Sequence, residues 1–372
     1  MRSAKVSDIT SIIEAHYPLY LAEDWDNSGL QIGSYKNKVT KAIIALDFDS
    51  DVLKMAIDIN AELIITHHPM FMKGIKSINY DLLSGSNIKS IINNDITVYS
   101  AHTNLDKGIN GLNDWLATTI GLKEIELLDN NYEDTLLKLV IYVPVSHLEE
   151  VRSAVNNAGS GNIGNYSDCS FRNLGIGTFK PSDNTNPFIG KSGHLEEVDE
   201  YRLETVVYKS NLSKVLQAMY DSHPYEEVAY DLYELHNTGK SYSLGRTGIL
   251  SNELTLQEFA GQVKSKLNID SLRVVGDLAK RIKTVAVVGG SGASLIPKVI
   301  NKNVDILITG DVKYHEARDA ENNGLAIIDA GHQGTEELMT YWLLDLLRAS
   351  CKKQAINVEF YPLLTKPCFK HL

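Results

Sequence analysis

Histidines and carboxylates recur in pairs along this chain, and these residue types together can hold metal ions. His67 and His68 are adjacent, and two other histidines each precede a carboxylate by four residues, namely His102 with Asp106 and His332 with Glu336. Each group follows a run typical of a buried strand, AELIIT, ITVYSA or LAIIDAG. Taken singly, the adjacent histidines could be solvated loop residues, and each histidine–carboxylate pair could be a capping interaction.

Four imidazoles and two carboxylates, with no cysteine among them, favour zinc, manganese, iron or cobalt over a structural zinc site built on thiolates. Six ligands are too many for one tetrahedral ion. They suit two ions about 3.5–4 Å apart, with a carboxylate able to bridge them. We therefore expect two divalent ions per chain, with zinc as the first expectation. Which ligand binds which ion stays open.

Two loops and two further residues are candidates for the surroundings of such a site. The loop Trp25–Gly33 is polar and contains glycine, so it is either an active-site wall or a turn with a core tryptophan. The turn Gly289–Gly292 ends a strand and opens a helix, where N–H groups can cradle a phosphate. Asp311 and His315 are the candidate catalytic residues, although Asp311 could instead orient a ligand. The general base is otherwise unknown.

An internal repeat is the feature that would bring these residues together. The segments KAIIALDFDSDVLKMAIDINAELIITHHP and KTVAVVGGSGASLIPKVINKNVDILITGD share one pattern of strand, helix and strand. Ile65 aligns with Ile308, 243 residues later, and His102 aligns with His332, 230 residues later, so the second copy is 13 residues shorter. Alternating strands and helices predict an α/β fold with largely parallel sheets. Ligands of such sheets bind beyond the carboxyl ends of the strands, where these histidines stand.

A segment of different character separates the two copies. Its elements run strand, helix, strand, strand, helix, strand, from LLKLVIYVP to EEVAYDLYEL, which is the order of a ferredoxin-like unit. We therefore predict three parts: residues 1–128 as the first α/β unit of the metal-binding core, 129–240 as an inserted ferredoxin-like domain, and 241–372 as the second α/β unit.

Composition narrows the class of protein further. The 372 residues carry 36 Lys and Arg against 47 Asp and Glu, a net charge of −11, which argues against binding nucleic acid over the whole surface. Three cysteines without metal-type spacing predict a reducing compartment and no disulfide framework. No stretch approaches the roughly 18 apolar residues of a membrane span, and the first 20 residues do not read as a signal peptide. We expect a cytoplasmic protein that does not bind a membrane.

Five motifs resemble those of a known family. WDNSGLQIG, ITHHP, SAHTNLD, ITGDVKYHEA and DAGHQGTE are similar to the motifs of the GTP cyclohydrolase I type 2 homologues, also called the NIF-three-like family. The resemblance implies a dinuclear metal site formed by His67, His68, His102, Asp106, His332 and Glu336. It also implies a homohexameric toroid with the metal sites facing an inner cavity, and an inserted domain resembling the PII or CutA signalling fold.

Two classes of function follow from these residues. In the first, the metals activate water for hydrolysis of a small molecule or nucleotide; for GTP this means hydration at C8 of guanine and loss of formate, and a phosphodiester or amide could use the same apparatus. In the second, the protein is a non-catalytic metal-binding hexamer that regulates or senses a small molecule through the insert. Removal of a metal ligand discriminates the two classes. A hydrolase should lose turnover while its assembly survives, whereas a binding protein need show no turnover at all.

Overall fold

The computed structural model describes residues 4–130 and 132–370 as a mixed α/β protein with several sheets, which agrees with the predicted α/β class. The chain divides into two compact units. The first comprises residues 1–131 and 242–372, and the second comprises residues 132–241. Within the described residues, none of the helices is both long enough and apolar enough to cross a membrane.

One five-stranded sheet forms the first half of the larger unit. Its strands lie in the order β1 (Gly29–Ile32), β4 (Thr97–Ser100), β3 (Leu63–Thr66), β2 (Lys41–Ala45) and β17 (Glu359–Leu363). All neighbours are parallel except the edge strand β1. The central strands are buried on both faces, as parallel strands covered by helices usually are.

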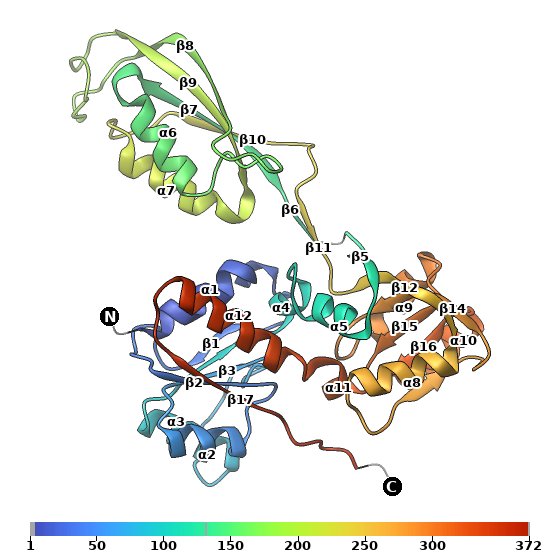
Figure 1. Ribbon diagram of the computed structural model, residues 1–372. Helices are drawn as coiled ribbons and strands as arrows, with labels where there is room; N and C mark the ends of the chain where they lie inside the picture. Colours follow the sequence, from blue (N-terminus) through green and yellow to red (C-terminus); the bar gives the residue numbers. More distant parts are fainter. Residues whose placement is uncertain (1–3, 131, 371–372) are drawn as a thin grey trace. The chain divides into compact units, whose positions relative to one another are not determined.

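Helices lie on both sides of this sheet (Figure 1), and alternate residues of its strands belong to two different cores. One face packs against α1 (Val6–His16) and α12 (Met339–Lys353). The other packs against α2 (Ser50–Ile59) and α3 (Leu83–Asn93). Because successive side chains of a strand point to opposite faces of the sheet, one apolar strand contributes residues to two hydrophobic cores.

A six-stranded sheet forms the second half of the larger unit. Its order is β13 (Arg273–Val275), β16 (Ala326–Asp329), β15 (Ile306–Thr309), β14 (Arg281–Val287), β12 (Arg246–Thr255) and β5 (Lys123–Leu127). One face carries α5 (Leu112–Ile120) and α8 (Leu256–Lys266), and the other carries α9 (Ile296–Asn301) and α10 (Tyr314–Asn322). Strands β14, β15 and β16 are parallel, in the same order as β2, β3 and β4.

The two halves of the larger unit exchange strands at their edges. β17, near the C-terminal end, pairs with β2 in the first sheet, and β5, from the first half of the sequence, pairs with β12 in the second. Each sheet is therefore completed by a segment from the other half of the sequence. Two short helices follow the third parallel strand of each copy, α4 (Thr103–Lys107) after β4 and α11 (His332–Glu336) after β16.

The second unit has its own sheet and its own core. Its antiparallel sheet has the order β10 (Tyr230–Glu234), β7 (Leu136–Pro144), β9 (Glu196–Tyr208) and β8 (Ser170–Phe179). Helices α6 (Leu148–Asn157) and α7 (Leu212–Ser222) pack on one face of the sheet. A two-stranded ribbon of β6 (Tyr132–Asp134) and β11 (Lys240–Tyr242) lies where this segment begins and ends in the sequence.

A buried arginine ties α4 and α5 to β12 in the larger unit. Arg246 is 1% exposed, and its Nε and Nη2 each donate to a different oxygen of Asp114 at 2.8 Å. The three N–H groups that remain, two on Nη1 and one on Nη2, lie within hydrogen-bonding distance of four backbone carbonyls, those of Ser243, Gly245, Lys107 and Gly108. The planar guanidinium therefore binds acceptors from three segments, namely α5, the end of α4 and the residues just before β12.

We expect Arg246→Met to lower the free energy of unfolding by about 3–5 kcal/mol, because it leaves Asp114 and buried carbonyls without their donor. Urea denaturation followed by circular dichroism measures the loss. Arg318→Met is the matched control, since Arg318 is exposed and its ion pair among the described residues is with Glu321, one turn away. Equal losses in the two variants would contradict the structural role of Arg246.

Candidate metal centre

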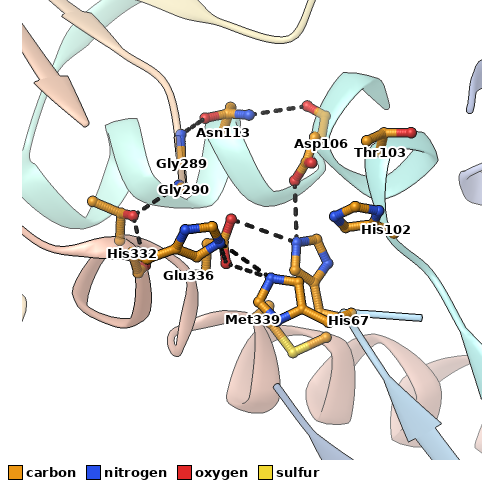
Figure 2. A network of polar contacts seen from close by, with 12 residues as sticks. His67, His102, Thr103, Asp106, Asn113, Gly289, Gly290, His332, Glu336 and Met339 are labelled. Carbon is orange, nitrogen blue, oxygen red and sulfur yellow. Dashed lines mark hydrogen bonds and ion pairs between the residues drawn. The ribbon is translucent and has the colours of Figure 1, made fainter. Parts of the chain in front are cut away.

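The carboxyl ends of the two sets of parallel strands carry the predicted ligands. His67 and His68 directly follow β3, and His102 stands between β4 and α4. Asp106 lies in α4, and α11 begins with His332 and ends with Glu336. The structure brings all six side chains into one cluster in the larger unit, as seen for most of them in Figure 2.

Glu336 lies at the centre of this cluster. Its Oε2 is 3.0 Å from Nε2 of His68 and 3.1 Å from Nε2 of His332, and its Oε1 is 3.7 Å from Nε2 of His67. Nε2 of His67 is also 3.5 Å from Oδ1 of Asp106. The ligand atoms form two overlapping groups of metal-binding size, His67 with His68 and His102, and His68 with His332 and Glu336. One carboxylate thus faces members of both groups.

All four imidazoles are held in the same way, by a hydrogen bond at Nδ1. His67 donates to the carbonyl of Ala101 at 2.8 Å. The other three pair with carboxylates at 2.7 Å: His68 with Asp47, His102 with Asp26, and His332 with Asp311. With Nδ1 protonated and donating, Nε2 presents its lone pair, which is how metal-binding histidines are usually oriented in proteins.

Three buried polar atoms in the cluster have no hydrogen-bond partner. They are Nε2 of His67, Oδ1 of Asp106 and Oε2 of Glu336. A buried polar atom without a partner costs free energy, and each of these is a good ligand for a divalent cation. The donor set therefore fits a metal centre, and the coarse prediction that these residues could hold a metal agrees with the structure.

Electrostatics in the cluster also favour a bound cation. Burial favours the neutral form of Glu336, yet the close imidazoles of His332, His67 and His68 hold its pKa well below the usual range. Burial lowers the pKa of His68, but Asp47 and Glu336 outweigh burial and raise that pKa to about 10. The buried carboxylate therefore draws positive charge onto the imidazoles around it. A metal cation would supply that charge while the imidazoles stay neutral.

The pKa values of Asp106 and of the more exposed His332 are also shifted by Glu336. Burial, followed by the charge of Glu336, raises the pKa of Asp106 to about 7. The close carboxylate of Glu336 raises the pKa of His332 to about 9 against the opposing effect of burial. Without another cation, two carboxylates this close compete for the same protons.

The glycine turn after β14 makes room for Glu336. Gly290 has φ +59°, and a Cβ placed on it would lie 2.2 Å from Oε1 of Glu336. The N–H groups of Gly289, Gly290 and Gly292 donate to Asn113, Thr335 and Thr309, respectively. These three donors are already engaged within the protein. A phosphate could not use these three N–H groups, and the turn admits a carboxylate.

Asn113 links the turn to the opposite side of the cluster (Figure 2). Its Oδ1 accepts from Gly289 N–H at 2.7 Å, and its Nδ2 donates to the carbonyl of Asp106 at 3.2 Å. Asn113 is 1% exposed, so both hydrogen bonds are buried away from solvent. Asn113 thereby connects the segment that carries Asp106 with the turn that admits Glu336.

The two candidate catalytic residues have different places. Asp311 joins the cluster, where it holds Nδ1 of His332. His315 is exposed on α10 with its ring against Tyr314, and it belongs to neither metal-binding group. Asp311 therefore acts on a candidate ligand, and the structure does not bring His315 to the cluster.

Sequence reasoning missed three of the four Nδ1 partners. Asp26 lies within WDNSGLQIG, and Asp47 lies at the end of β2, where the repeat aligns it with Gly290. A search for acids at the ends of neighbouring strands could have found Asp47. The carbonyl of Ala101 carries no sequence signal, because every residue has one.

Fold and cluster together define a class, that of α/β proteins in which two sheets surround a histidine- and carboxylate-rich candidate metal centre. The family model described as Duf34/NIF3 (NGG1p interacting factor 3) matches residues 4–367. The chain belongs to this family.

Relatives of this family match along nearly the whole chain. Proteins named GTP cyclohydrolase 1 type 2 homolog from Halalkalibacterium halodurans and Bacillus subtilis are each 43% identical, covering 96% and 97% of this chain and 96% of each relative. A crystal structure of a Bacillus cereus protein related to NIF3 superposes with a TM-score of 0.88 at 40% identity, with both chains fully covered.

We expect Gly290→Ala to lower zinc affinity at least about tenfold, because its Cβ displaces the carboxylate at the centre of the cluster. Competition with a chromogenic chelator measures the affinity. Gly324→Ala is the matched control: φ is +75° there, and nothing lies within 4 Å of the added Cβ. The control bears a similar backbone cost but should retain zinc, so loss of zinc from both variants would refute the steric explanation.

Proposed function

We propose that this protein is a hydrolase that depends on a pair of divalent metal ions, zinc first among the candidates. The observation that carries the proposal is the shared orientation of four imidazoles, whose Nδ1 atoms are all held by the protein. Two carboxylates lie among them, and the central one faces ligand atoms of both groups. His67, His68, His102, Asp106, His332 and Glu336 would hold the metals.

Bound there, a pair of divalent ions would acidify a water molecule and polarise the electrophile that the water attacks. The protein's own part is to fix the ligands and to limit access. His67 is fully buried, whereas the side chain of His332 is 38% exposed. Substrate would therefore reach the centre from the side of His332. Asp311 keeps the exposed imidazole in one tautomer and one orientation.

The names of the relatives support a nucleotide as one candidate substrate, since they refer to a GTP cyclohydrolase. GTP hydrolysis at C8 of guanine and hydrolysis of a phosphodiester are both within the chemistry of a two-metal centre. No nucleic-acid substrate is proposed, given the net charge of −11.

A second candidate is a metal-binding protein that senses a small molecule, and the separate unit 132–241 favours it. Its element order and its strand order β10-β7-β9-β8 support an inserted ferredoxin-like domain, similar to the PII or CutA fold, with a core of its own. A regulatory insert would add a ligand site to a metal-binding core without requiring turnover.

Metal analysis tests the proposed centre. We expect about two ions per chain in protein purified without chelator or metal-affinity resin, and clear loss in Asp106→Ala and in His332→Ala, because each removes a ligand. Inductively coupled plasma mass spectrometry measures the content. His315→Ala and Asp319→Ala are matched controls on α10 and should retain the metal.

Activity then separates the two candidates. A hydrolase should release product from GTP or a phosphodiester, and both ligand variants should lose this turnover while their assembly mass is unchanged. Metal binding without turnover would favour the sensing protein. Absence of metal, with no uptake of added zinc or manganese, would refute the metal centre itself.

We also propose a homo-oligomer, with a homohexamer as the expectation. Two exposed apolar surfaces support assembly. One is the edge strand β8, with Phe171, Leu174 and Ile176 at 59–68% exposure. The other is formed by the loop after β3 and the first residue of α3, whose exposed apolar side chains are Met72, Ile75, Ile78, Tyr80, Leu82 and Leu83. Clusters of exposed apolar side chains commonly mark contacts between proteins.

Light scattering coupled to size exclusion tests the assembly. We expect a mass about six times that of the chain, because both apolar surfaces would then be removed from water. A single-chain mass across the micromolar range would overturn the proposed assembly and leave the metal centre unaffected.

A further inference from the structure

Trp25 is an exposed aromatic ring beside the candidate metal centre. Its side chain is 61% exposed, and its ring centroid lies 5.9 Å from that of His102, at an interplanar angle of 77°. A ring this exposed has at least one open face. The sequence left two readings of this loop, a wall of the site or a turn with a core tryptophan. The exposure of Trp25 excludes the core reading.

The loop that carries Trp25 is anchored to the ligand-bearing segments on its C-terminal side. Asp26 Oδ1 accepts from Nδ1 of His102 at 2.7 Å, while Oδ2 accepts from the backbone N–H and hydroxyl of Thr103 and from the hydroxyl of Ser28. The carboxylate next to Trp25 is therefore bound to a candidate ligand and to the residue that follows that ligand in the chain.

Further contacts fix the loop on both sides of the tryptophan. Glu23 N–H donates to the hydroxyl of Thr103 at 2.9 Å, and Asp26 N–H donates to the carbonyl of Glu23 at 2.9 Å. Asn27 Nδ2 donates to the carbonyl of Phe71 at 2.6 Å, just beyond His67 and His68 in the sequence. The backbone around Trp25 is thus held at a defined place relative to both histidine segments.

An anchored aromatic ring with an open face can stack a flat ring of a ligand. Every nucleobase has a π-face, and stacking on an aromatic side chain is worth a substantial part of the affinity of single nucleotides. Tryptophan offers a large face and loses little conformational freedom, particularly when its loop is already held.

We propose that Trp25 is a substrate-binding residue that stacks a planar heteroaromatic ring, so that substrates of this centre carry such a ring beside the group that is hydrolysed. This inference rests on the proposed metal-dependent hydrolase and names its substrate class. A nucleotide or a similar fused heterocycle satisfies it, whereas a sugar phosphate or a simple peptide does not.

Binding of matched ligands tests the proposal on the full-length, zinc-loaded protein. The probes are GMP, AMP and UMP, with ribose 5-phosphate as the ligand that shares the phosphate and sugar but lacks a base. Isothermal titration measures Kd for the parent, Trp25→Ala and Trp25→Phe. Metal content is measured in the same samples. Tyr341→Ala is the control for loss of an exposed aromatic side chain, since Tyr341 lies on α12.

We expect at least one nucleotide to bind the parent about tenfold or more tightly than ribose 5-phosphate does. Trp25→Ala should lose this preference, Trp25→Phe should keep most of it, and Tyr341→Ala should keep all of it. Metal content should stay at the parental level in all three variants.

Three outcomes would overturn the inference. They are no preference for any nucleotide over ribose 5-phosphate in the parent, an unchanged preference in Trp25→Ala, and an equal loss of affinity for nucleotide and ribose 5-phosphate in that variant. With parental metal content, each of these leaves the metal-dependent hydrolase intact. A parent that binds no metal contradicts the hydrolase instead, so the two failures are distinguishable.

Discussion

The buried carboxylate of Glu336 is the constraint around which the larger unit is organised. An ionised carboxylate is expensive to bury unless it is paired and hydrogen-bonded. Here three imidazoles approach it, from two different sheets, and the nearest nitrogens lie at 3.0 and 3.1 Å. A buried carboxylate needs these partners held in place. The residues that orient the imidazoles, and the turn that leaves space for the carboxylate, meet that need.

The two copies of the repeat contribute to the centre unequally. In the first copy, Asp47 holds His68; in the second, Gly290 stands at the position aligned with Asp47 and leaves space for Glu336. Asp311, aligned with His68, holds a histidine instead of serving as one. A duplicated pair of sheets thus supplies a single asymmetric site, with a buried side at His67 and a more open side at His332.

The anchoring of the site extends into its surroundings by the same kind of contact. Asp26 binds His102 and, through its neighbours, holds the loop that carries Trp25. Asn113 joins the turn beneath Glu336 to the backbone at Asp106. Each of these side chains forms one hydrogen bond with a candidate ligand or its backbone and another with a loop. The arrangement of the ligands and the walls of the site are therefore coupled.

The sequence by itself identified the candidate metal ligands and the class of fold. Residue type and spacing identified the six side chains that the structure brings together, and strand–helix alternation predicted the mixed α/β class. The tertiary structure alone decided which atom holds each imidazole, that the glycine turn admits a carboxylate, and that β17 and β5 each complete the other half's sheet. The physical reason is distance along the chain: His102 and Asp26 are 76 residues apart, and His332 and His68 are 264 apart. The local sequence pattern predicts where a helix or strand lies and where it ends. The residue that a side chain contacts depends on how distant segments of the chain pack together.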